Sequence, residues 1–162
     1  MTNSKDTSFS NLDLVLIAIT ISLLVLTWGY LIIEYSSLPD IIAVHFDALG
    51  KPNGYSSKEN IWFAPAIFSI LSIAFIFGAK HQEAITFPKR KIGSTEKSSN
   101  LKMMLYTALL LAIICPLIVY TIIEASIIKN FEMPWLMPII IGIVAIYIGV
   151  VFYYKFKTLK LS

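Results

Sequence analysis

The sequence predicts an all-α membrane protein whose chain crosses the bilayer four times. Hydrophobic residues make up 57% of its 162 residues and charged residues only 14%, whereas about a quarter of the residues in soluble domains are charged. Four apolar runs contain no Asp, Glu, Lys, Arg or His, and each is close to the roughly 20 residues that a helix needs to span a bilayer. In lipid the backbone must hydrogen-bond within its own segment, which predicts helices rather than strands.

The four helices are expected at about residues 14–33, 61–79, 103–123 and 135–154, within one integral membrane domain that covers residues 1–162. The first run is longer than the apolar core of a typical signal peptide, and no A-x-A cleavage site follows it. We therefore interpret it as an uncleaved anchor and as the first of the four spans.

Charge and motif content argue against several classes of function. A net charge of +3 is too small to indicate a nucleic-acid partner, and the single cysteine, Cys115, cannot form an intrachain disulfide or a zinc–cysteine cluster. Neither an HExxH nor a Gly-x-Ser-x-Gly motif is present, and the spans lack the ionisable residues that mark ion or proton pathways. We expect a protein that is not an enzyme and has no catalytic residues, cofactor or metal, with the lipid bilayer as its main partner.

The distribution of positive charge predicts the orientation of the chain. Ten Lys and Arg residues lie before the first span, in residues 80–102 and after the last span, whereas three lie in residues 34–60 and 124–134. Positively charged segments stay on the cytoplasmic side. We therefore expect both termini and residues 80–102 in the cytoplasm, and the loop 34–60 outside.

Three tryptophans, Trp28, Trp62 and Trp135, fall at the expected outer ends of helices. The first interpretation is an aromatic belt, because amphipathic rings prefer the level of the lipid headgroups. The alternative is that some of these rings form a floor beneath the loop 34–60.

The loop 34–60 is 27 residues long, and loops of this length are usually functional or disordered. Its sequence favours order, with a short β-hairpin. Residues 42–47 have the period-2 pattern of a strand, with Ile42, Val44 and Phe46 on one face and Ala43, His45 and Asp47 on the other. Turn residues follow between 50 and 54, and Tyr55 starts a return strand. Ser56 and Glu59 have the spacing of a capping box, which we expect to begin the second helix.

The order of residues in this loop resembles a family of bacterial membrane proteins of unassigned function, whose best-known members are immunity proteins for the sporulation-delaying-protein toxin. In that family the loop reads LP-x-x-I-P-x-H-F-N-x-x-G-x-P-D-x-x-x-S-K. This chain departs from the pattern at Ala43, Asp47 and Asn53. It matches at Leu38, Pro39, Ile42, His45, Phe46, Gly50, Pro52, Ser57 and Lys58.

The resemblance implies a multi-pass protein of the bacterial cytoplasmic membrane that recognises or protects against a membrane-active peptide toxin through its outward loop. We expect a polar surface formed by His45, Asp47 and Lys58, with Phe46 and Tyr55 beneath it. The full set of candidate binding residues is Asp40, His45, Phe46, Asp47, Tyr55 and Lys58. The candidate structural residues of the loop are Leu38, Pro39, Gly50, Pro52, Ser56, Ser57 and Glu59.

Three alternatives remain for these residues and for the protein. Asp40, His45 and Lys58 can serve only to hydrogen-bond the loop to itself. The protein can also be a membrane sensor that sequesters a small regulatory protein on the basic residues 80–102, which as a simpler interpretation control topology and attract anionic lipid. A membrane enzyme that uses His45 of the outer loop is the third alternative.

Overall fold

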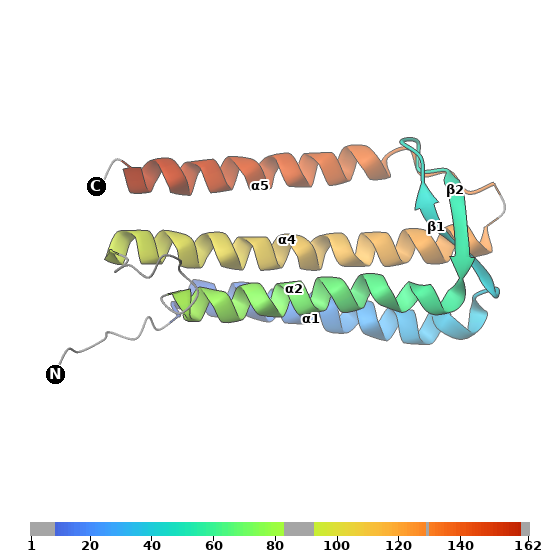
Figure 1. The fold of residues 1–162 in the computed structure, drawn as a ribbon, viewed down its shortest axis with the longest axis horizontal. Helices are drawn as coiled ribbons and strands as arrows, with labels where there is room; N and C mark the ends of the chain where they lie inside the picture. Colours follow the sequence, from blue (N-terminus) through green and yellow to red (C-terminus); the bar gives the residue numbers. More distant parts are fainter. Residues whose placement is uncertain (1–8, 83–92, 129, 160–162) are drawn as a thin grey trace.

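A computed structural model describes residues 9–82, 93–128 and 130–159. Figure 1 shows long helices lying side by side with a small sheet at one end of the bundle. The helices are α1 (Asn11–Glu34), α2 (Phe63–Lys80), α4 (Ser94–Ile127) and α5 (Leu136–Leu159). Between α1 and α2 the chain forms a 3-10 turn η1 (Tyr35–Ser37), strands β1 (Ile41–Phe46) and β2 (Pro52–Ser57), and a second 3-10 turn η2 (Lys58–Trp62).

The predicted fold class is confirmed. Within the residues that the structure describes, four helical segments are long and apolar enough to cross a membrane: Asn11–Ser37, Lys58–Lys80, Glu96–Ile127 and Leu136–Phe156. Helices α1 and α4 extend beyond the predicted spans at both ends, α4 most of all, because an apolar run marks only the part of a helix that suits lipid; α2 and α5 begin at Phe63 and Leu136, slightly later than predicted, and end later. Residues 83–92, which belong to the predicted basic loop, and Lys129 lie outside the described residues.

The start of α1 is fixed by a capping box that the sequence prediction missed. The amide of Asp13 donates to the Ser10 hydroxyl over 3.3 Å, and the amide of Ser10 donates to the Asp13 carboxylate over 2.9 Å. These bonds satisfy backbone groups that a helix start leaves without partners. Asp13 thus belongs to the first turn of the helix and is buried, although the sequence placed it at the edge of the span.

The bundle is organised around α4, which packs against α1, α2, α5 and β1. The main core lies between α1, α4 and the sheet, and includes Leu31, Ile42, Ile61 and Val119. In contrast, only 6% of the most apolar stretch of α5 is buried inside the protein, and Figure 1 shows α5 on the far side of α4 from α1 and α2. The sheet therefore rests on the compact part of the molecule, and α5 is attached through α4.

Candidate functional site

The hairpin, which we define as β1, β2 and the turn between them (residues 41–57), is a two-stranded antiparallel sheet. The register pairs Ile42 with Ser56 and Ala43 with Tyr55, then shifts at Val44, so that His45 faces Gly54. The predicted alternation is confirmed on one face, because Ile42 is buried and Val44 and Phe46 pack against the same core.

The turn of the hairpin is built by Asp47. Its carboxylate accepts from the amides of Leu49 and Lys51 over 2.8 and 2.9 Å, and its carbonyl accepts from the amide of Gly50. Gly50 has a φ of +72°, a conformation that favours glycine. Asp47 was predicted to contribute to a binding surface with His45, but its carboxylate is used by the backbone of the turn.

The hairpin is held against residues that lie far along the chain. The amide of Ala43 donates to the hydroxyl of Ser126 near the end of α4, over 3.2 Å. The ammonium group of Lys51 lies 2.8 Å from the Glu132 carboxylate. Phe46 packs against a second cluster that contains Phe131, Met133 and Leu136. Both the strand and the turn are therefore anchored on α4 and on the segment that leads to α5.

The base of the hairpin is closed by Asp40 and Lys58. The Lys58 amide donates to the Asp40 carbonyl over 3.0 Å, and their side chains form an ion pair at 3.3 Å. The Lys58 ammonium also lies 5.7 Å from the centre of the Tyr35 ring. These contacts support the interpretation that Asp40 and Lys58 bond the loop to itself. Leu38, two residues before Asp40, is buried.

The predicted capping box at Ser56 and Glu59 is wrong. Ser56 lies within β2 and accepts a hydrogen bond from the Asn60 side chain. The chain leaves β2 through η2, whose N-cap is Ser57 and has no side-chain capping bond; the Ser57 side chain hydrogen-bonds the Glu59 carboxylate. Ser56 and Glu59 have the spacing of a capping box, but β2 continues to Ser57 and the chain then forms the 3-10 turn η2 before α2 begins.

Aromatic rings form a floor beneath the hairpin. The rings of Trp28 and Trp62 stack with centroids 5.9 Å apart, and Tyr35 lies 4.8 Å from Trp62. Trp62 and Tyr35 pack against the cluster that contains Leu38 and Ile42. The second interpretation of the tryptophans therefore holds for Trp62, which packs against the loop, while Trp28 stacks on Trp62 and donates to the Ser69 hydroxyl of α2 over 3.0 Å. Trp135, in contrast, is half exposed.

The outer face of the hairpin carries exposed side chains of mixed chemistry. His45 is exposed and lies close over Gly54, where an added β-carbon would come 2.8 Å from its ring. Tyr55, expected beneath the polar surface, is instead 63% exposed. Ile41 and Leu49 are also exposed, and sequence reasoning missed both. The signal for Ile41 was its position one residue before Ile42, on the opposite face of the strand.

A pocket of about 300 Å³ lies between the hairpin and the end of α4. Lys51, Pro52 and Tyr55 line it from the hairpin. The opposite wall was not predicted as part of a site, because the sequence of residues 125–131 contains no recognisable binding or catalytic motif. That wall comprises Ala125, Ser126, Ile127, Ile128, Asn130 and Phe131.

Comparisons with known proteins recognise the segment that contains the hairpin. Residues 22–68 match the sequence family described as "Domain of unknown function (DUF1648)". An "Uncharacterized protein" of the archaeon Archaeoglobus fulgidus is 42% identical over 65 residues, which are 40% of this chain and 33% of the relative. The chain thus spans about a third of the length of that relative. No solved structure matches this chain. These similarities support a membrane-protein family of unassigned function, and the segment that matches the family model, residues 22–68, includes the hairpin.

Proposed function

We propose that the protein is a membrane-bound recognition protein that protects its cell against a membrane-active peptide by binding it on the outward face of the hairpin. Its role then resembles that of the toxin-immunity proteins. The observation that carries this proposal is that the loop between α1 and α2 is fixed by contacts with distant residues. Ala43 bonds to Ser126, 83 positions later, and Lys51 bonds to Glu132, 81 positions later. Such anchoring gives the exposed face of the hairpin a fixed shape.

The cost of ordering the loop supports a role beyond connecting two helices. Fixing 27 residues costs on the order of 1 kcal/mol per residue in backbone entropy. Burial of Ile42, the Ser126 hydrogen bond and the aromatic floor offset that cost. A flexible connector needs none of these contacts, whereas a binding surface gains affinity when its conformation is fixed in advance.

The chemistry of the exposed face fits an amphipathic peptide. Ile41, Leu49 and Tyr55 offer apolar contact, and the exposed imidazole of His45 offers a hydrogen-bonding group. Aromatic residues such as tyrosine are enriched in the contact area of protein interfaces. The pocket beside Tyr55 provides a recess for one side chain of the partner. We therefore place recognition on His45 and Tyr55, and assign Asp40, Asp47 and Lys58 to holding the hairpin.

The test is protection of cells by variants that reach the membrane normally. Cells that lack the protein should be sensitive to a membrane-active peptide made by the same or a neighbouring strain, and the wild-type gene should restore resistance. His45→Ala and Tyr55→Ala should restore less resistance at equal abundance in the membrane. Ser36→Ala, an exposed change in η1 outside the hairpin, is the matched control and should protect fully.

A loop replacement tests the same proposal from the other side. When a Gly-Ser linker replaces residues 38–55, α1 and α2 stay connected but the exposed face is lost. Protection should then disappear, provided that immunoblotting finds the variant in the membrane fraction. Unchanged protection by this variant would mean that the loop is a tether, and the proposal would be withdrawn.

A further inference from the structure

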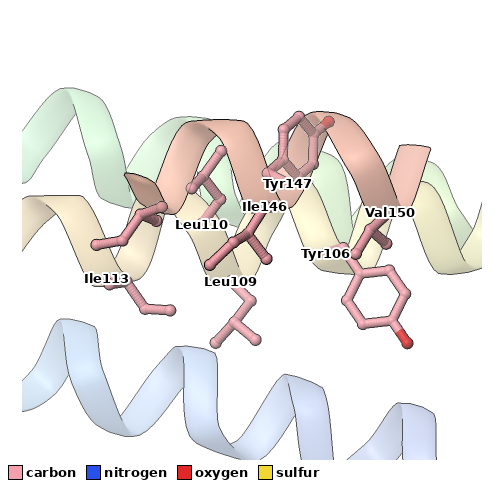
Figure 2. Close-up of a pocket in the computed structure, with 8 residues that line it drawn as sticks. Tyr106, Leu109, Leu110, Ile113, Ile146, Tyr147 and Val150 are labelled. Carbon is pink, nitrogen blue, oxygen red and sulfur yellow. The ribbon is translucent and has the colours of Figure 1, made fainter. Parts of the chain in front are cut away.

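The interface between α4 and α5 contains an apolar pocket of about 150 Å³. Figure 2 shows the side chains that form it, contributed by these two helices only. Ile146 on α5 is 71% exposed, so the pocket opens on the outside of the bundle. The lining residues are Tyr106, Leu109, Leu110, Ile113, Ile143, Ile146, Tyr147 and Val150.

The length of this pocket along the helix axis fits within a single leaflet of the bilayer. Ile113 lies at the middle of the apolar run of α4, and Tyr106 lies two turns nearer the end of the bundle that is opposite the hairpin (Figure 1). At 1.5 Å per residue these positions are about 10 Å apart along the helix, while one leaflet contributes roughly 15 Å of hydrocarbon. The pocket therefore runs from the middle of the membrane toward the interface near the first turn of α1 and the last turns of α5.

Polar groups gather at the interfacial end of the pocket. The Tyr106 and Tyr154 hydroxyls lie 3.4 Å apart, and the Tyr147 hydroxyl lies 2.6 Å from that of Thr107. Lys102, one turn before Tyr106 on α4, has its ammonium group 5.9 Å from the centre of the Tyr154 ring. An apolar recess is thus followed, in the direction of the interface, by hydroxyl groups and a positive charge.

We propose that this pocket binds one acyl chain of an anionic phospholipid, from the leaflet on the side of the chain termini, with its phosphate near Lys102 and the Tyr106 hydroxyl. The pocket is complementary to such a lipid: its apolar recess suits the acyl chain, and the ammonium group of Lys102 suits the phosphate. An ammonium group near the membrane surface attracts anionic headgroups. The lipid site goes beyond the proposed recognition of a peptide and does not depend on it.

The experiment is native mass spectrometry of the full chain, purified in detergent and incubated with phosphatidylglycerol and phosphatidylcholine of identical acyl chains. The wild-type protein should retain one phosphatidylglycerol, with a preference of about fivefold over phosphatidylcholine, the scale expected for one lysine at a membrane surface. Lys102→Gln should still retain a lipid, but the preference should fall to about one because the headgroup interaction is lost. Lys80→Gln, an exposed lysine at the same end of the bundle on α2, should keep the wild-type preference.

A second pair of variants tests the acyl-chain part of the site. Ile146→Trp should fill the pocket and abolish lipid retention, whereas Ile141→Trp, at a position on α5 that is 66% exposed and does not line the pocket, should retain lipid like the wild type. Val150→Phe fills the same recess if the tryptophan variant does not fold. Equal retention of the two lipids by the wild-type protein, or undiminished retention by a folded pocket-filling variant, would overturn the proposal.

Discussion

Gly50 in the turn of the hairpin lies directly against the backbone of Met133: a β-carbon added to this glycine would be 2.5 Å from the Met133 carbonyl oxygen. Two independent requirements therefore meet at one residue. The backbone of the turn needs a positive φ, and the neighbouring segment leaves no room for a side chain. The contact joins the first loop to the segment between α4 and α5, and it leaves no room for a side chain at Gly50.

Gly50→Ala should destabilise the protein by about 2 kcal/mol or more, because strain at positive φ adds to overpacking against a backbone atom. The thermal unfolding midpoint in detergent measures this effect. Gly142→Ala in α5 is the matched control, since a β-carbon there meets nothing within 4 Å and alanine favours a helix. Equal unfolding midpoints for Gly50→Ala and the wild-type protein would contradict the close approach to Met133.

Ser10→Ala should lower stability by about 1 kcal/mol, the usual effect of losing an N-cap. The change removes the hydroxyl that accepts from the Asp13 amide, and it leaves the carboxylate of a buried aspartate with fewer partners. Thermal unfolding in detergent again provides the measurement. Ser36→Ala, at an exposed serine of η1, should have no effect, and a loss of similar size in both variants would argue against a specific cap.

The ion pair between Lys51 and Glu132 should make stability depend on pH at alkaline values. Glu132 raises the pKa of Lys51 above its ordinary value of 10.5, through a hydrogen bond and charge attraction. A raised pKa means that the stabilisation is fully present below pH 10.5 and is lost as the pH rises through the pKa of the folded protein.

The measurement for this pair is the difference in unfolding midpoint between the wild-type protein and Lys51→Met. It should be constant near neutral pH, shrink above pH 10.5, and shrink in concentrated salt because both side chains are exposed. Lys80→Met, at an exposed lysine far from the hairpin, is the control. A difference that did not change with alkaline pH would show that Lys51 acts through packing alone.

Orientation is tested by single cysteines in a Cys115→Ala background. Asn53→Cys places a thiol on the exposed edge of β2, and Ser94→Cys places one at the start of α4. The excess of Lys and Arg on one side predicts that a membrane-impermeant thiol reagent applied to intact cells labels the first and spares the second. Labelling of Ser94→Cys alone would reverse the orientation and remove the hairpin from the outer surface.

The helices and the hairpin could be predicted because their causes are local. Lipid requires an unbroken apolar run, and residues 14–33 and 103–123 supplied that signal directly. The alternation around Ile42, Val44 and Phe46 predicted the strand by its period. The bonds of Asp47 to the turn could also have been found, since an aspartate three residues before a glycine is a common way to start a turn.

The partners of the hairpin could not be predicted, because they depend on how distant segments meet. No pattern in the sequence associates Ala43 with Ser126 or Gly50 with Met133. The capping prediction at Ser56 failed for a related reason: pairing with Ile42 kept this serine in β2, so that tertiary contacts overrode a local signal. The exposure of Tyr55 likewise depends on where β2 lies relative to the end of α4.

The contacts of the hairpin also determine when it can become stable during synthesis. The hairpin leaves the ribosome before α4, yet the groups that hold it, Ser126, Glu132 and Met133, are translated about 80 residues later. Until these residues have been synthesised, the loop between α1 and α2 lacks the contacts that fix it. A chain that ends before Ser126 retains residues 22–68, which match the family model of unknown function, but has none of these contacts, so protease should cut its loop much faster than that of the full chain.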